Sequence, residues 1–257
     1  MKTYIVGNWK MNFTVGESSI YLHKLLKLIH FYRGIEVVVA PSTIALQTLS
    51  LQLNRQSNRK KVKLAAQNLY YRDYGAYTGE VSVSQLTGIV DYAIIGHSER
   101  RYIFGETDKE ISKKVAAAIR GNITPILCVG ETANERDFGE TEEVLKDQLL
   151  SGLRDVSLED IKKVIIAYEP VWAISSVKGA RLASPDDVAR SIEIIHEQLK
   201  ALYKKDENPV LYGGSVNPSN AGAYLTIPGV NGLLMGGSSL IADQFNAIID
   251  LAKRVQN

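Results

Sequence analysis

Residues 4–10 read Tyr-Ile-Val-Gly-Asn-Trp-Lys, a short apolar run that ends in polar side chains. Runs of this kind recur along the whole chain. They are continuous instead of alternating with polar residues, which is typical of parallel strands that are buried on both faces. Eight of these runs predict strands: Tyr4–Gly7, Ile35–Ala40, Val62–Ala66, Tyr92–Ile95, Ile123–Val129, Val164–Ala167, Val210–Tyr212 and Gly232–Met235.

Amphipathic stretches with helical spacing lie between the predicted strands, for example Ile111-Val115-Ala118 and Val188-Ile192-Ile195-Leu199. Two helix starts, Ser184-Pro185-Asp186-Asp187 and Thr141-Glu142-Glu143, carry the caps, proline or acidic residues that a first turn favours. This alternation predicts the α/β class. Because no linker rich in Pro, Gly or Ser divides residues 1–257, the pattern favours a single domain folded as one closed (β/α)₈ barrel. A doubly wound open sheet is the alternative, since periodicity alone does not separate the two folds.

Composition argues against several classes of partner. The longest stretch without a charge, residues 208–242, is broken by Gly, Pro, Asn and Ser, so we expect no membrane span. Cys128 is the only cysteine, and no export signal precedes the first predicted strand, so the expected location is the cytoplasm. The net charge of +2 is small and the one basic run lacks aromatic residues, so we expect no nucleic-acid partner; that run comprises Arg55, Arg59, Lys60, Lys61 and Lys63.

Polar residues that could carry chemistry follow six of the predicted strands. In a (β/α)₈ barrel the carboxyl ends of the strands form the functional face, so side chains at these ends meet at one mouth. A carboxylate, an imidazole and an ammonium group there predict proton transfer, with a base, a neutral hydrogen-bond donor and a cation that stabilises a developing oxyanion. The strand ends read Asn8-Trp9-Lys10, Gly96-His97-Ser98-Glu99-Arg100, Cys128-Val129-Gly130-Glu131, Tyr168-Glu169-Pro170-Val171-Trp172, Gly213-Gly214-Ser215 and Gly236-Gly237-Ser238.

Two Gly-Gly-Ser turns, at residues 213–215 and 236–238, end the last two predicted strands. Glycines leave backbone amides uncovered, and the second turn also opens a predicted helix whose N-terminus favours negative charge. The pair therefore predicts a phosphate-bearing substrate. The alternative is that the glycines only permit tight turns.

The remaining residues that could bind a metal do not gather into a ligand set. His23, His30 and His196 lie on predicted helices without partners, so we expect neither a metal nor a cofactor. Cys128 is interpreted as an inert core thiol.

Four motifs resemble those of the triosephosphate isomerase family, and they span the chain in the family's order. The resemblance implies a TIM barrel that interconverts dihydroxyacetone phosphate and D-glyceraldehyde 3-phosphate through an enediolate, in glycolysis and gluconeogenesis. The motifs are Gly7-Asn8-Trp9-Lys10-Met11-Asn12, Gly96-His97-Ser98-Glu99-Arg100-Arg101, Tyr168-Glu169-Pro170-Val171-Trp172-Ala173-Ile174 and Tyr212-Gly213-Gly214-Ser215-Val216.

The resemblance also implies a role for individual side chains. Glu169 would take a proton from one carbon and return it to the next, while neutral His97 would polarise the carbonyl and shuttle a hydroxyl proton. Lys10 and Asn8 would stabilise the charge on oxygen, and Glu99 would hold Lys10.

The same resemblance implies a phosphate site and a second subunit. Tyr212 and Ser215 would latch a closed lid over the substrate. The segment Gly75–Glu80 resembles the loop that family members insert into a partner, where Thr78 supports the partner's active site, so a homodimer is implied. The backbone amides expected to bind phosphate are those of Ser175, Ser215, Gly236 and Gly237.

The lid after Trp172 departs from the family pattern. Family members usually read Ala-Ile-Gly-Thr-Gly-Lys-Thr, whereas this chain replaces both glycines and is about three residues longer over Ser175–Leu182. We expect hinges at Pro170–Trp172 and at Gly179-Ala180. A longer lid would leave room for a slightly larger, C4 ketose phosphate, so an isomerase of that substrate is one alternative. A catalytically silent barrel kept for binding is the other, and the intact catalytic residues argue against it.

Overall fold

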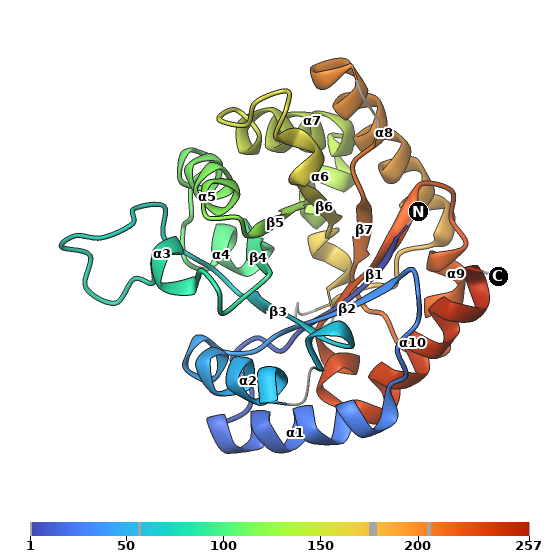
Figure 1. The fold of residues 1–257 in the computed structure, drawn as a ribbon. Helices are drawn as coiled ribbons and strands as arrows, with labels where there is room; N and C mark the ends of the chain where they lie inside the picture. The colour runs from blue at the N-terminus through green and yellow to red at the C-terminus, as the bar shows by residue number, and fades with distance from the viewer. Residues whose placement is uncertain (1, 56–57, 175–178, 205–206, 257) are drawn as a thin grey trace.

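Eight parallel strands close into a barrel in the order of the sequence, from β1 next to β2 round to β8 next to β1 (Figure 1). The computed structural model describes residues 2–55, 58–174, 179–204 and 207–256. The closed barrel confirms the predicted (β/α)₈ fold, and the open-sheet alternative is wrong. The strands are β1 Thr3–Asn8, β2 Ile35–Ala40, β3 Lys63–Ala66, β4 Tyr92–Ile95, β5 Thr124–Val129, β6 Ile165–Tyr168, β7 Val210–Gly213 and β8 Val230–Met235.

Strand ends differ from the predicted ones by one or two residues, except in β2 and β4, where the bounds agree. The largest difference is in β8, which begins at Val230 and not at Gly232. Gly232 lies inside this strand, and the position requires glycine because any side chain would place its Cβ only 2.0 Å from the Tyr4 carbonyl oxygen of β1. A glycine that looks like a boundary in the sequence is thus a point of close strand contact.

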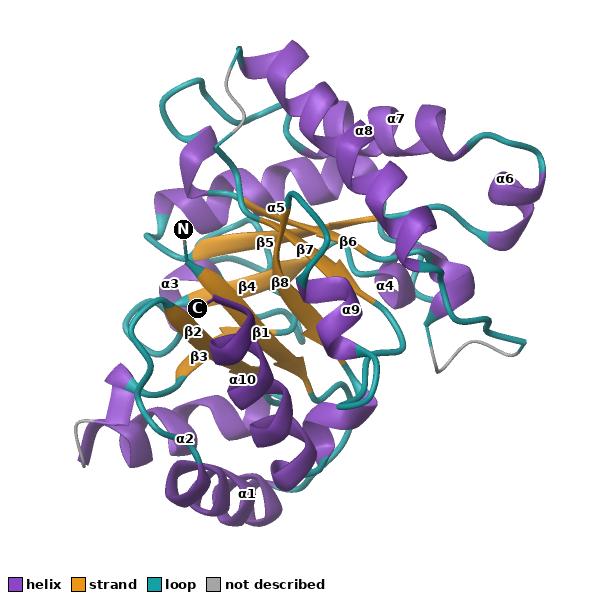
Figure 2. Ribbon diagram, turned by 90° about the vertical axis from the view of Figure 1, so that its right-hand side faces the viewer, coloured by secondary structure: helices purple, strands orange, loops and turns teal. Residues whose placement is uncertain are grey.

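Helices surround the barrel and cover its outer face (Figure 2). Ser184 caps α8 with a reciprocal bond to Asp187, as predicted, whereas Thr141 is the first residue of α7 and Glu140 before it makes no side-chain cap. No helix in the described part of the chain is long and apolar enough to cross a bilayer. The helices are α1 Val15–Leu28, α2 Thr43–Arg55, α3 Val83–Leu86, α4 Ser98–Tyr102, α5 Asp108–Arg120, α6 Ala133–Asp137, α7 Thr141–Gly152, α8 Pro185–Tyr203, α9 Ala221–Leu225 and α10 Ala242–Gln256, with 3₁₀ helices η1 Asn58–Lys60, η2 Ile161–Lys163, η3 Val171–Ala173 and η4 Gly237–Leu240.

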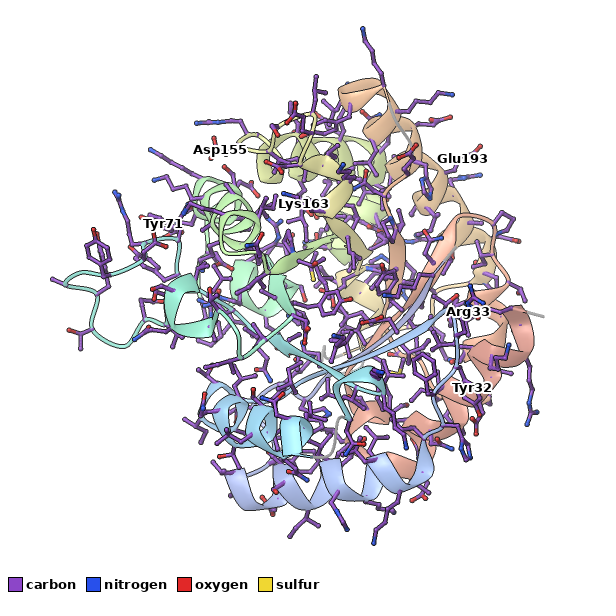
Figure 3. All side chains as sticks on the ribbon, in the orientation of Figure 1. Tyr32, Arg33, Tyr71, Asp155, Lys163 and Glu193 are labelled. Atoms are coloured by element: carbon purple, nitrogen blue, oxygen red, sulfur yellow. The ribbon has the colours of Figure 1, made fainter. Side chains whose placement is uncertain are left out.

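The apolar core has two layers, one inside the barrel and one between the strands and the helices. In β5, Ile126 and Cys128 point into the barrel, and Leu127 and Val129 pack against the helices. Both faces of each strand are therefore buried, which is why the strands appear in the sequence as continuous apolar runs. Figure 3 shows side chains filling the barrel, so it is a packed core and the chemistry is left to its rim.

Candidate active site

The Glu169 carboxylate lies at the carboxyl end of β6, between the ends of β5 and β7. Its backbone N–H donates to the Val129 carbonyl over 2.7 Å. Two glycines make room for it: a Cβ at Gly130 would come within 2.0 Å of the Glu169 carbonyl oxygen, and one at Gly213 within 2.6 Å of its Cγ. The neighbouring strand ends therefore fix both the backbone and the side chain of Glu169.

His97 faces this carboxylate from the end of β4. The distance from His97 Nε2 to Glu169 Oε1 is 3.4 Å, and each residue is only 5% exposed. The second carboxylate oxygen, Oε2, is buried and has no hydrogen-bond partner among the described residues. The pair thus combines a fixed imidazole with a carboxylate oxygen that is still able to accept a proton.

The backbone of α4 determines which nitrogen of His97 carries the proton. His97 is the N-cap of this helix, and its Nδ1 accepts the backbone N–H of Glu99 over 3.2 Å. A ring nitrogen that accepts a hydrogen bond has no proton of its own, so the imidazole carries its hydrogen on Nε2. His97 therefore presents a neutral N–H donor on the side that faces Glu169.

Lys10 lies at the end of β1 and adopts a left-handed backbone conformation, with φ of 51°. Its N–H donates to Asn8 Oδ1 over 3.0 Å, and its Nζ is 2.7 Å from Glu99 Oε1. The structure therefore brings the predicted Lys10, Asn8 and Glu99 together. Because Glu99 also supplies the amide that His97 accepts, one residue of α4 contacts both the ammonium group and the imidazole.

The turn after β8 lies next to Lys10: a Cβ at Gly236 would be 3.4 Å from Lys10 Cε. No hydrogen bond within the described ranges uses the backbone amides of Gly236 or Gly237. The predicted helix here is only the 3₁₀ helix η4, which ends at Leu240 before α10 begins at Ala242. The expected anion-binding feature is thus a turn with two open amides, followed by a single short 3₁₀ helix and not by a long α-helix.

Both hydrogen-bond donors of Ser215, which follows β7, are already used within the protein. Its N–H and Oγ both donate to the Ala173 carbonyl, over 3.1 and 2.8 Å. The Tyr212 hydroxyl is buried, and its pKa is raised, mainly by that burial and further by the neighbouring Tyr224. The structure therefore connects Ser215 to the last residue of η3. Ser175, the fourth predicted phosphate ligand, lies outside the described residues.

A fully buried carboxylate, Glu131, holds the N-terminal side of the lid. Its Oε1 accepts the indole N–H of Trp172 over 2.8 Å and the hydroxyl of Tyr168 over 3.1 Å. The Arg136 guanidinium lies 4.2 Å from the centre of the Trp172 ring. Burial raises the pKa of Glu131 above its usual range. The sequence places Glu131 at a strand end but does not reveal this contact with Trp172.

The remaining predicted residues lie away from this mouth. Thr78 is exposed on the loop between β3 and α3, which projects from the barrel (Figure 1). His23 and His196 are on α1 and α8, whereas His30 follows α1 instead of lying on it. No group of three or more His, Cys, Asp or Glu side chains with metal-binding geometry occurs in the part of the chain that the structure describes.

Gln67, which follows β3, is a site residue that the sequence analysis missed. Its Nε2 donates to the carbonyl oxygens of Lys10 and Ala40, each over 2.8 Å. The rule that polar residues at strand ends meet at the mouth would have selected it, had it been applied to the third predicted strand.

Comparisons with known proteins agree with this geometry. A family model described as triosephosphate isomerase matches residues 3–252. A triosephosphate isomerase of Clostridium tetani is 42% identical over 253 residues, covering 97% of this chain and 96% of the relative. That of Natranaerobius thermophilus is 38% identical over 254 residues, covering 98% and 97%. The crystal structure of triosephosphate isomerase from Bartonella henselae matches with a TM-score of 0.84 and 37% identity, covering 98% of this chain and 99% of that one. This chain belongs to the triosephosphate isomerase family.

Proposed function

We propose the residues through which this chain performs its family's reaction. The chain is an isomerase that interconverts dihydroxyacetone phosphate and D-glyceraldehyde 3-phosphate. We assign the base to Glu169, the electrophile to His97, and the stabilisation of negative charge on oxygen to Lys10 and Asn8.

The isomerisation has two steps, removal of a proton from C1 and its return to C2. The Glu169 carboxylate takes a proton from C1 of dihydroxyacetone phosphate, and the electron pair of that C–H bond forms the C1–C2 double bond of the enediolate. The negative charge that develops on the carbonyl oxygen is met by the His97 Nε2–H and the Lys10 ammonium group. Glu169 then returns the proton to C2, while His97 moves a proton from the C1 oxygen to the C2 oxygen. The product is an isomer, so no external oxidant or reductant takes part.

The observation that carries this assignment is the buried Oε2 of Glu169, which has no partner in the described chain while Oε1 lies 3.4 Å from the His97 Nε2. A carboxylate that serves only structure has its buried oxygens satisfied, as in Glu131 with its two hydrogen-bonded donors. An unsatisfied oxygen beside a neutral N–H donor instead fits a base waiting for a substrate proton.

The phosphate is assigned to the amides of Gly236 and Gly237, joined by Ser215 once its bonds to Ala173 are released, and by Ser175. Ser238 Oγ donates to the Val216 carbonyl over 2.6 Å, which fastens the two glycine turns to each other. A fixed pair of turns holds the phosphate end while the reacting carbons lie between Glu169 and His97.

We also propose that residues 1–257 act as one catalytic domain, that two copies form a homodimer in the cytoplasm, and that the reaction serves glycolysis and gluconeogenesis. The projecting loop that bears Thr78 supports the dimer, because it is exposed over residues 74–80 and aromatic near its tip: Tyr74 is 90% and Tyr77 is 40% exposed. The single, buried Cys128 suits a reducing compartment.

The variant Glu169→Gln tests the assignment. An amide cannot accept the substrate proton, so we expect turnover to fall by roughly 10²–10⁴-fold or more, while the affinity for glycerol 3-phosphate, which has no carbonyl, stays nearly unchanged. The matched control is Glu142→Gln, the same change at an exposed position in the first turn of α7, which should leave turnover unchanged.

Assays with C3 and C4 ketose phosphates complete the test. The full-length matches do not favour a C4 substrate or a silent barrel, so we expect turnover only with the C3 pair. Retained turnover in Glu169→Gln would contradict the assigned base, and preference for the C4 substrate would contradict the assigned reaction.

A further inference from the structure

Gln67 uses both hydrogens of its side-chain NH₂ group on backbone carbonyls. Nε2 has two hydrogens, and these go to the carbonyl oxygens of Lys10 and Ala40, each over 2.8 Å. The Ala40 oxygen also accepts the Trp9 N–H over 3.0 Å. The Gln67 amide thus links the residues that follow β3 to the end of β2 and to Lys10, which lies just beyond the end of β1.

Lys10 needs such support because its backbone conformation is unfavourable. A residue with a side chain at φ of 51° is strained, and strained residues persist only where their surroundings fix them. Asn8 accepts the Lys10 N–H, and Gln67 donates to the Lys10 carbonyl on the other side of the same Cα. The two amides hold the peptide groups on both sides, and together they set the direction in which the lysine side chain leaves the backbone.

The same pattern occurs once more at the opposite end of the barrel, where it is distant from the chemistry. Asn208, before β7, donates through Nδ2 to the carbonyls of Ile161 and Val164 over 2.7 and 2.8 Å. Both of its acceptors lie before β6, on the amino-terminal face. Asn208 is thus a structural counterpart of Gln67, and it allows the contribution to stability to be separated from the contribution to Lys10.

We propose that Gln67 is a positioning residue for the isomerisation: it touches no substrate and acts by holding Lys10 in the left-handed conformation that directs its ammonium group to the substrate oxygen. The inference rests on the role proposed above for Lys10. Without the amide, Lys10 relaxes toward an ordinary backbone conformation and its charge moves away from the oxygen on which the negative charge develops.

The first test replaces Gln67 by Met, which has a similar length but no donor. We expect kcat/KM to fall by roughly 10- to 100-fold, because a displacement of about 1 Å at a reacting centre has an effect of this size. In Gln67→Glu, kcat/KM should fall at least as far, because the carboxylate would face two carbonyl oxygens and has no hydrogen to donate to them. Its activity relative to the parent should then rise as the pH is lowered, since a protonated carboxyl group can donate to one of them.

A double-mutant cycle with Lys10→Ala separates positioning from general damage. If Gln67 acts through Lys10, then Gln67→Met lowers kcat/KM and the affinity for glycerol 3-phosphate in the parent, but changes either by less than about twofold in Lys10→Ala. Asn208→Leu removes two similar bonds and should lower the thermal midpoint, while its effect on kcat/KM is the same with and without Lys10.

The outcomes are distinguishable from a failure of the proposed function. If Lys10→Ala has the turnover of the parent, the role of Lys10 is wrong and the inference about Gln67 is wrong with it. If Lys10→Ala is impaired but Gln67→Met lowers kcat/KM equally in both backgrounds, the role of Lys10 remains and Gln67 is only structural. If Gln67→Met unfolds, the pH dependence of Gln67→Glu decides: a constant ratio to the parent overturns the inference.

Discussion

The Cys128 thiol lies inside the barrel in the same packed layer as Ile126 and Ala167. It is 1% exposed, and its pKa is raised, mainly by burial and further by the nearby Glu169 carboxylate. Both causes disfavour the thiolate, which is the reactive form of cysteine. The residue therefore fills space under the site and takes no part in the proposed proton transfers.

This environment predicts that Cys128 resists alkylation. Iodoacetamide should modify the native protein at least roughly 100-fold more slowly than the protein unfolded in urea. Raising the pH toward the usual thiol pKa of about 8.5 should accelerate labelling of the unfolded chain only, because the folded state keeps the thiol protonated. Mass spectrometry of one labelled cysteine checks this, and equally fast native labelling would show an accessible thiolate.

Individual residues of the candidate site were predictable because one rule, that polar residues follow apolar strands, selects Asn8, Lys10, His97 and Glu169 together. The rule does not report how a donor is already used. The bonds from Ser215 to the Ala173 carbonyl join residues 42 positions apart, and only the folded chain shows that these donors are occupied.

Among the segments, the one that follows Trp172 differs most from the family pattern. Trp172 is fixed to Glu131, and the Arg181 N–H donates to the Trp172 carbonyl over 3.0 Å, so described residues on both sides of the lid contact each other. Gly179 lies between them with φ of 80°. A Cβ at Gly179 would meet nothing within 4 Å, so only its backbone conformation restricts the residue type. Residues 175–178, at the centre of the predicted lid, lie outside the described chain.

We predict that Gly179→Val slows turnover and increases the release of inorganic phosphate and methylglyoxal from dihydroxyacetone phosphate. A β-branched residue resists this positive φ, and a lid that closes poorly leaves the enediolate exposed to water. The matched variant Gly179→Asn adds a side chain of similar size that tolerates the left-handed region, and it should partition like the parent. Phosphate released per isomerisation measures the effect, and equal partitioning in Gly179→Val would place the hinge elsewhere.

The strands and long helices such as α5 and α8 followed from periodicity, whereas the short elements did not. The helices α3, α4, α6 and α9 have four or five residues, too few for an amphipathic repeat to be recognised. One of them, α4, supplies both the amide that His97 accepts and the Glu99 carboxylate next to Lys10. The most important short helix at the site was therefore recognised only as a motif and not as a helix.

At the scale of the whole molecule, the loop between β3 and α3 projects far from the barrel (Figure 1). Tyr70, at its base, packs against Tyr77 and Tyr71 with tilted rings, whose centres lie 4.8 and 4.4 Å from its own. Figure 3 places Tyr71 at the root of this loop, well outside the barrel. An ordered aromatic projection of this kind fits insertion into a second copy, as the family resemblance implies.

We expect the protein to sediment as a dimer at micromolar concentration and Thr78→Arg to separate it into subunits with lower activity. Burying an unpaired guanidinium costs roughly 3–5 kcal/mol, which weakens association by at least about 100-fold. Thr226→Arg, the same change at the exposed residue that caps the C-terminus of α9, is the control and should remain dimeric. A monomeric parent with full activity would contradict the homodimer.

The hydrogen bonds from Ser215 to the Ala173 carbonyl compete with the phosphate for the same donors. In the proposed site an anion that takes the Ser215 N–H must displace the Ala173 carbonyl, which lies at the end of η3 and two residues before Ser175. Phosphate affinity and the position of this segment are then thermodynamically linked, and the linkage is reciprocal. If releasing the Ser215–Ala173 bonds raises the affinity for the anion by some factor, then binding of the anion shifts the equilibrium toward the released state by the same factor. Phosphate binding and the position of the segment around Ala173 are therefore coupled in both directions.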